Sequence, residues 1–195
     1  MKKLMFLAIA ACLSVSMTLA ASGESPKNKS LCGIEVLTGF SEGKLIKKQG
    51  DYHLVPFLVD FDFDLKPFLQ KFKFSPRNAV LFQLEPFMSF VSSPDDNIET
   101  GVSFMLKAGL LPDTSRFQPY VKAGVGMVYM TQHMREQATQ FNFTEQGGAG
   151  IQCFFSKNTS FILEGRFRHL SNAGIKTPNH GIGTYSILTG IAYRF

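Results

Sequence analysis

The sequence predicts an all-β protein, specifically an eight-stranded antiparallel transmembrane β-barrel. Three observations support this prediction. Apolar and polar residues alternate along most of the chain, residues 1–20 have the layout of a secretory signal, and the last alternating strand ends on an aromatic residue, Phe195. Alternation gives each strand one face toward lipid and one face toward the barrel interior. An even number of such strands closes without a free edge, as a bilayer requires.

The N-terminal segment predicts export from the cytoplasm. A basic start at Lys2 and Lys3 precedes an apolar run and then small residues around Ala20, where cleavage is expected. Cys12 lies in a stretch similar to a lipoprotein cleavage box, but cleavage there would leave a very short apolar core, so an ordinary cleaved signal is favoured. The expected organisation is a signal peptide over 1–20, a periplasmic lead-in over 21–31 and an outer-membrane barrel over 32–195.

Eight segments after the signal show the strand pattern. In the second, the odd-numbered residues from Val55 to Phe63 are apolar, whereas Asp60 and Asp62 face the other way. The third and fourth alternate similarly, and these runs match the ~9–11 residues with which a tilted strand crosses a bilayer. The expected strands are 32–41, 52–63, 79–91, 98–110, 118–130, 142–155, 160–169 and 184–195. The connection over 65–78 is the longest between the early strands and has room for a short helix.

The seventh strand has one apolar face and one charged face. Phe161, Leu163 and Phe167 alternate with the charged residues, and His169 falls on their apolar side. We therefore expect His169 outside the barrel wall, in contact with lipid. The charged side chains expected to fill the interior are Glu85, Lys107, Glu164, Arg166 and Arg168.

The direction of the seventh strand follows from closure of the barrel. With both termini in the periplasm, this strand runs outward and delivers His169 near the outer interface. The connection over 170–183 is then external, and 156–159 forms a short periplasmic turn.

The end of the seventh strand carries a motif that contains a candidate nucleophile and base. A lone His-x-Ser pair is uninformative, but His169 and Ser171 continue into Asn172-Ala173-Gly174 and then Pro178-Asn179-His180-Gly181. Over residues 169–182, and more weakly over 119–126 and 148–150, the sequence resembles the lipid A 3-O-deacylase (PagL) family, also described as acyloxyacyl hydrolase-like outer-membrane proteins.

The resemblance implies a function and assigns roles to residues. Family members are outer-membrane barrels that hydrolyse an ester of lipid A with a serine nucleophile and a histidine base, which implies these roles for Ser171 and His169. It also implies that groups around Asn172 and Gly174 hold the oxyanion. The expected location is the outer membrane of a Gram-negative cell, with the site facing the outer leaflet.

One departure from the family pattern concerns the acid that orients the histidine. The ungapped match puts Gly183 at that position, and no Asp or Glu occurs between His169 and Phe195. A triad without its acid loses control of the histidine tautomer. The candidates to replace it are Asn179, His180, a backbone carbonyl, Glu145 and Glu136. A non-catalytic structural or interaction barrel is therefore the alternative function, and a small secreted sandwich is disfavoured by the terminal strand.

Partners and cofactors follow from the remaining composition. The formal net charge of +5 becomes +3 when Lys2 and Lys3 leave with the signal, which is too small and dispersed to predict nucleic-acid binding. The four histidines lack metal-ligand spacing, so no metal or cofactor is expected. Cys32 and Cys153 fall on strands that are not neighbours, which predicts free thiols. The expected partners are lipid A of lipopolysaccharide and membrane lipid, and the choice between a monomer and a homodimer stays open.

Overall fold

The computed structural model describes residues 30–45, 50–134 and 136–195. The expected signal peptide and nearly all of the expected lead-in lie outside the described residues, as does Cys12. No helix in the described ranges is long and apolar enough to span a membrane.

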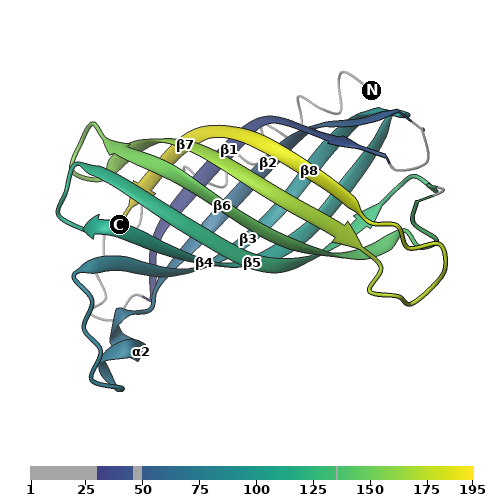
Figure 1. Cartoon of the computed structure of the whole chain (residues 1–195). Coiled ribbons are helices and arrows are strands. Elements are labelled where there is room, and N and C mark those ends of the chain that lie inside the picture. Colours follow the sequence, from purple (N-terminus) through teal and green to yellow (C-terminus); the bar gives the residue numbers. More distant parts are fainter. Residues whose placement is uncertain (1–29, 46–49, 135) are drawn as a thin grey trace.

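The described chain forms a closed antiparallel barrel of eight strands in sequence order, with β1 paired to β8 (Figure 1). The prediction of an eight-stranded barrel is confirmed. The strands are β1 Leu31–Lys44, β2 Asp51–Asp64, β3 Asn78–Ser93, β4 Asn97–Pro112, β5 Phe117–Met130, β6 Phe141–Phe154, β7 Thr159–Ser171 and β8 Ile182–Arg194.

Several strands extend farther than the alternation predicts. β7, for instance, ends at Ser171 rather than His169, because Phe143 on β6 still pairs with Ser171. Backbone pairing thus continues past the point where the hydrophobic pattern fades. The candidate serine consequently lies on the strand, at its last position.

The long connection between β2 and β3 contains the short helix for which the sequence has room. Helix α2 spans Lys66–Gln70, with Pro67 in its first turn, where a missing N–H costs nothing. Lys66 forms an ion pair with Asp113 in the β4–β5 turn. In Figure 1, α2 projects from the barrel at the end where the C-terminus lies, whereas the β7–β8 connection is at the opposite end.

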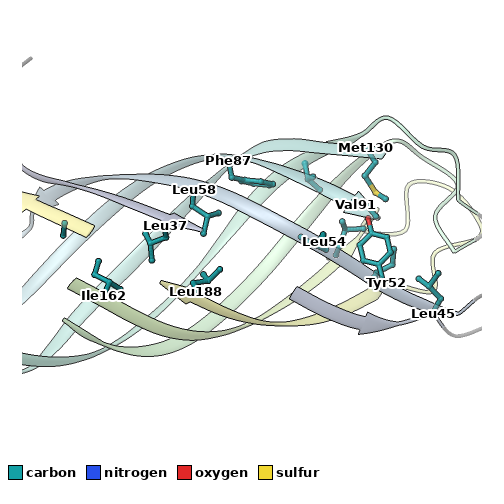
Figure 2. Close-up of a cluster of buried hydrophobic side chains, with 14 of the residues drawn as sticks. Leu37, Leu45, Tyr52, Leu54, Leu58, Phe87, Val91, Met130, Ile162 and Leu188 are labelled. Atoms are coloured by element: carbon teal, nitrogen blue, oxygen red, sulfur yellow. The ribbon is translucent and has the colours of Figure 1, made fainter. Parts of the chain in front are cut away.

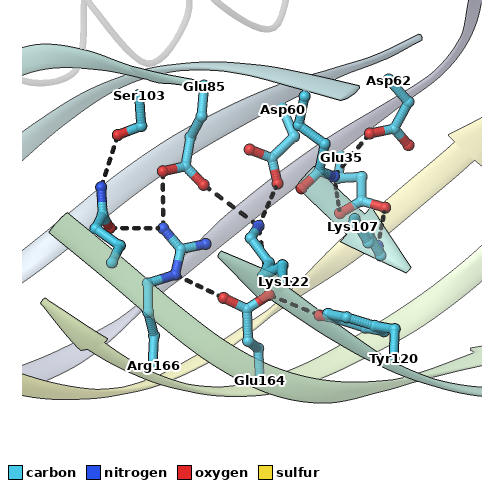
Figure 3. A network of polar contacts seen from close by, with 12 residues as sticks. Glu35, Asp60, Asp62, Glu85, Ser103, Lys107, Tyr120, Lys122, Glu164 and Arg166 are labelled. Carbon is cyan, nitrogen blue, oxygen red and sulfur yellow. Dashed lines mark hydrogen bonds and ion pairs between the residues drawn. The ribbon is translucent and has the colours of Figure 1, made fainter. Parts of the chain in front are cut away.

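Charged side chains fill one part of the barrel interior (Figure 3). Arg166 binds Glu85 and Glu164, each at 2.7 Å, and Lys122 lies 3.2 Å from Asp60. Buried charges are tolerated when they are paired, and each of these charged groups has an opposite partner, although Asp60 Oδ1 and Arg166 Nη2 lack a hydrogen bond among the described residues. The prediction that Glu85, Lys107, Glu164, Arg166 and Arg168 face inward is confirmed, since all five are buried.

Apolar side chains fill the interior on either side of this network. Tyr52, Leu54, Val91 and Met130 gather toward the end that carries the β7–β8 connection (Figure 2). The Tyr52 hydroxyl donates to Glu99 at 2.6 Å, and Glu99 also binds Arg168 at 2.6 Å. An interior cavity lined in part by Glu85, Phe87 and Arg166 has a volume of about 20 Å³, roughly the space of one water molecule. The barrel is therefore a packed core.

The outer wall is predominantly apolar. Exposed outward side chains include Leu106, Val125 and Ile187, with Ile187 71% exposed. An apolar surface that encircles a barrel fits a lipid environment. Cys32 and Cys153 are free thiols, as predicted.

Candidate active site

His169 and Ser171 lie on the outward face of β7. Their neighbours Arg168 and Leu170 are buried in the interior, whereas Phe167 on the outer face is 40% exposed. His169 and Ser171 are each half-buried. The expected position of His169 outside the wall is confirmed, at the end of the barrel away from the C-terminus.

A tight turn follows Ser171 directly. Ala173 and Gly174 both have positive φ, 53° and 78°, and the Ile175 N–H donates to the Asn172 carbonyl at 3.1 Å. Two consecutive left-handed residues inside such a bond are typical of a type I′ turn. Gly174 adopts this conformation at little cost, whereas Ala173 must be held in it by its surroundings.

Asn172 holds the turn in place. Its side chain is fully buried, its Nδ2 donates to the Lys176 carbonyl at 2.8 Å, and its Oδ1 accepts from the Gly174 N–H at 3.0 Å. The Asn172 N–H donates to the Asn179 Oδ1 at 2.9 Å. The loop between β7 and β8 is therefore ordered by polar side chains whose hydrogen bonds are satisfied within it.

These contacts decide which donors lie close to the serine. The amides of Asn172 and Gly174 are already engaged within the loop, while the Ala173 N–H lies 3.5 Å from Ser171 Oγ. An oxyanion role for the groups around Asn172 and Gly174 stays a prediction. In this arrangement the nearest backbone donor to the serine oxygen is the amide between them.

The imidazole of His169 packs against the backbone of Gly181. A Cβ at position 181 would lie 2.9 Å from His169 Nε2, and Gly181 itself has φ 72°. Among the described residues, neither ring nitrogen of His169 forms a hydrogen bond, and Ser171 Oγ contacts only the Ala173 amide. Catalytic hydrogen bonds are often long in substrate-free enzymes and tighten when the substrate binds.

Two positions flank His169 on the neighbouring strands. Its Cα partners are Glu145 on β6 and Gly183 on β8. Glu145 faces outward like His169, and a Cβ at Gly183 would meet only the Phe167 ring, at 3.4 Å or more. The structure thus places one of the candidate acids, Glu145, directly beside the candidate base.

The other candidate side chains lie in the loops, and among the described residues neither carboxylate oxygen of Glu136 has a hydrogen-bond partner. Glu136 is fully buried in the β5–β6 connection, and its main-chain carbonyl accepts from the His180 N–H at 3.0 Å. The Asn179 side chain is engaged with Asn172. Strand pairing could have singled out Glu145 from the sequence, because β6 and β7 pair symmetrically about Lys157. That register requires the turn to be centred correctly, which the alternation alone does not specify.

Within the described ranges, no group of three or more His, Cys, Asp or Glu side chains is arranged to hold a metal ion. The candidate site comprises a serine, a histidine, a neighbouring carboxylate and backbone amides. These are the components of a hydrolase that uses a covalent intermediate.

Comparison with solved structures shows the fold. The outer membrane enzyme PagL is 17% identical, covers 81% of this chain and 97% of its own, and superposes with a TM-score of 0.61. Neisserial surface protein A is 8% identical, covers 84% of this chain and 97% of its own, and has a TM-score of 0.64. PagL is an enzyme, whereas Neisserial surface protein A is described as a surface protein. The shared barrel therefore does not by itself assign an activity.

Comparison of sequences identifies the family. No curated protein matches the sequence. The model of the family described as lipid A 3-O-deacylase (PagL) matches residues 59–192, which is more than half of the chain. Neither this match nor the similar structures support a homodimer. The chain belongs to the lipid A 3-O-deacylase (PagL) family, whose members act on lipid A in the outer membrane of Gram-negative bacteria.

Proposed function

We propose that this protein is an esterase that releases an ester-linked acyl chain from lipid A, at the 3-O position named in the family's description. The observation that carries the proposal is the placement of His169 and Ser171 on the lipid-facing side of β7, within the last three residues of that strand. With both termini in the periplasm, this end of the barrel faces the outer leaflet, which contains lipopolysaccharide. Ester bonds of lipid A lie near the membrane interface, at the depth of this site.

The reaction takes place in two steps. Ser171 Oγ attacks the ester carbonyl while His169 takes the hydroxyl proton. The bond between the carbonyl carbon and the sugar oxygen then breaks, and His169 returns the proton to that oxygen, which leaves an acyl-serine. A water molecule attacks the acyl-serine with His169 again as base, and the fatty acid departs as Ser171 regains its proton.

Backbone donors supply the second contribution to catalysis. An amide aimed at the developing oxyanion is worth about 3–4 kcal/mol in comparable hydrolases. The Ala173 amide donates to Ser171 Oγ at 3.5 Å, which puts a backbone donor beside the atom that attacks the ester. Asn172 and Gly174 support it because their hydrogen bond fixes the turn from which that amide projects.

The test is mass spectrometry of lipid A from cells that produce the wild-type protein or a variant. Ser171→Ala is expected to reduce cleavage below about one-thousandth of the wild-type rate. The folded barrel should be unaffected, because removal of one partly exposed hydroxyl changes stability by about 0.5 kcal/mol or less. Ser93→Ala is the matched control, since Ser93 lies on β3 at the same end of the barrel. Full cleavage by Ser171→Ala would exclude the esterase.

A second function has one observation in its favour. Gly183 stands where the resemblance puts the family's acid, as expected of a barrel that retained the shape of the site but lost its activity. A correctly inserted wild-type barrel that leaves lipid A unchanged would support this non-catalytic role.

A further inference from the structure

Glu145 is unusual among the acidic residues of the barrel because it faces lipid. Phe141 and Phe143 precede it on the outer face of β6, nearer the strand end, and Ala149 and Ile151 follow it on the same face. In the described strands, the other acidic side chains either point into the interior or lie within three residues of a strand end. A carboxylate on the lipid-facing surface is unfavourable to an extent that increases with its depth in the bilayer. Its presence there calls for a compensating role.

The register of the barrel supplies a partner. Glu145 and His169 are directly opposite one another on β6 and β7, and both face outward. Side chains paired in this way have Cβ atoms about 4.5–5.5 Å apart, which a glutamate spans easily. On the other side of Glu145, β5 contributes the apolar Val125. His169 is therefore the polar group across the strand that Glu145 can reach.

We propose that Glu145 is the positioning residue that orients His169, occupying on β6 the role that the family assigns to β8. The inference rests on the proposed esterase function. Positions 145 and 183 flank His169 on its two sides, since each is its direct cross-strand neighbour. This chain has glycine at one of them and glutamate at the other. The acid is therefore present, but on β6 instead of β8.

The chemistry requires a small movement of the histidine. In the structure the ring packs on Gly181. When the acyl chain displaces that contact, the imidazole turns to lie between Glu145 and Ser171. The carboxylate then accepts a hydrogen bond from one ring nitrogen, which leaves the other nitrogen free to take the serine proton. Because lipid has a low dielectric constant, the carboxylate stabilises the resulting imidazolium more than it would in water.

Few other ionisable groups surround His169. Tyr185 on β8 pairs with Phe167, which lies two residues before His169 on the same face. His180 lies in the β7–β8 loop, where its N–H donates to the Glu136 main-chain carbonyl. Arg168 points into the barrel, where Glu99 binds it. The carboxylate that faces His169 from the adjacent strands is that of Glu145.

The first test replaces Glu145 with leucine or glutamine in the full-length protein in detergent or vesicles containing lipid A. Glu145→Leu is expected to lower kcat by about 10²–10⁴-fold with little change in KM, while it raises thermal stability because an apolar side chain replaces a charge in lipid. Glu145→Gln should lower kcat less than Glu145→Leu, because the amide oxygen can still accept a hydrogen bond from the ring but carries no charge to stabilise the imidazolium. Glu42→Leu is the matched control: Glu42 also faces outward opposite a histidine, His53, but on β1.

The second test moves the acid back to β8. Gly183→Glu alone should change kcat less than about 3-fold, because His169 already has its carboxylate. In the Glu145→Leu background, Gly183→Glu should restore kcat at least about 10-fold, because it supplies a carboxylate from the other neighbouring strand. Space for that side chain exists, since a Cβ at Gly183 meets only the Phe167 ring.

The outcomes separate this inference from the proposed function. If Ser171→Ala abolishes cleavage while Glu145→Leu cleaves as fast as the wild type, Glu145 has no positioning role and the esterase stands. If the wild type does not cleave lipid A, nitrogen NMR of labelled histidine, recorded in vesicles that contain lipid A, still decides. One tautomer of His169 in the wild type and a mixture in Glu145→Leu would support the inference, whereas identical spectra would overturn it.

Discussion

At the scale of single residues, the site depends on backbone conformations that few side chains tolerate. Ala173 and Gly174 hold left-handed dihedrals immediately after Ser171, and Gly181 holds another where His169 packs on the loop. Strained or glycine-dependent backbone of this kind often lies at functional sites, where packing maintains it. The fully buried side chain of Asn172 supplies that packing through its bonds to Lys176 and Gly174.

Gly181→Ala tests the importance of that close approach. The added methyl would fall 2.9 Å from His169 Nε2, and the φ of 72° adds a backbone cost of about 1–2 kcal/mol. We expect ester cleavage to fall at least about 10-fold, because the ring or the loop must move. Kinetics and thermal unfolding in the same detergent measure the two effects.

Gly165→Ala provides the control for this substitution. Gly165 lies on β7, on the same outer face as His169, and nothing lies within 4 Å of a Cβ at position 165. Its activity and melting temperature should match the wild type. Equal losses in both variants would mean that an added methyl is harmful at either position, and that the contact with His169 is not the cause.

At the scale of elements, the alternation predicts strand faces well and loop contacts poorly. The period of two correctly predicts that His169 points outward and Arg166 inward. Once one face of a strand is buried, every second residue along that strand points to the same side. The loops have no such period. The contact between the β5–β6 and β7–β8 connections, in which the Ala138 N–H donates to the Pro178 carbonyl at 2.9 Å, arises from the closed barrel alone. Glu145, the neighbour of His169 on β6, is an intermediate case. Its position can be predicted from the sequence if the turn between β6 and β7 is centred correctly.

Gly190 reveals how closely β8 and β1 approach where the barrel closes. A Cβ at this position would overlap the carbonyl oxygen of Val36 on β1. Gly190→Ala should therefore separate β1 and β8 locally and reduce the fraction of the protein that stays folded in an unheated detergent sample. Heat-modifiable migration on a gel measures this fraction. Gly165→Ala again serves for comparison, and unchanged migration of Gly190→Ala would show that the seam can expand.

At the scale of the whole molecule, the ion network stabilises the interior without touching the site. Arg166 joins Glu85 from β3 and Glu164 from β7, so it links strands on different sides of the barrel (Figure 3). Lys122 connects the same cluster to Asp60. Because the members are buried, removal of one partner leaves a charge that water cannot solvate.

Arg166→Met is predicted to destabilise the barrel by about 3–5 kcal/mol, because Glu85 and Glu164 lose the closer of the two cations that they share and keep only Lys122, at 3.4 and 3.5 Å. The triple variant that also replaces both glutamates with glutamine should recover most of that loss. Urea unfolding from detergent or vesicles measures both. In the fraction that stays folded, cleavage of lipid A should be unchanged, and a parallel loss of kcat would mean that the network also positions β7.

The filled interior has a consequence for how such an enzyme would encounter its substrate. With side chains packed through the described part of the barrel, the interior cavity beside Arg166, at about 20 Å³, is too small for an acyl chain. Lipid A would have to arrive, and the fatty acid leave, sideways across the wall at β6, β7 and β8. The quantity that governs the rate is then the number of lipid A molecules per unit area of membrane. The proposed reaction is two-dimensional, and its speed would depend on the fluidity and crowding of a single leaflet.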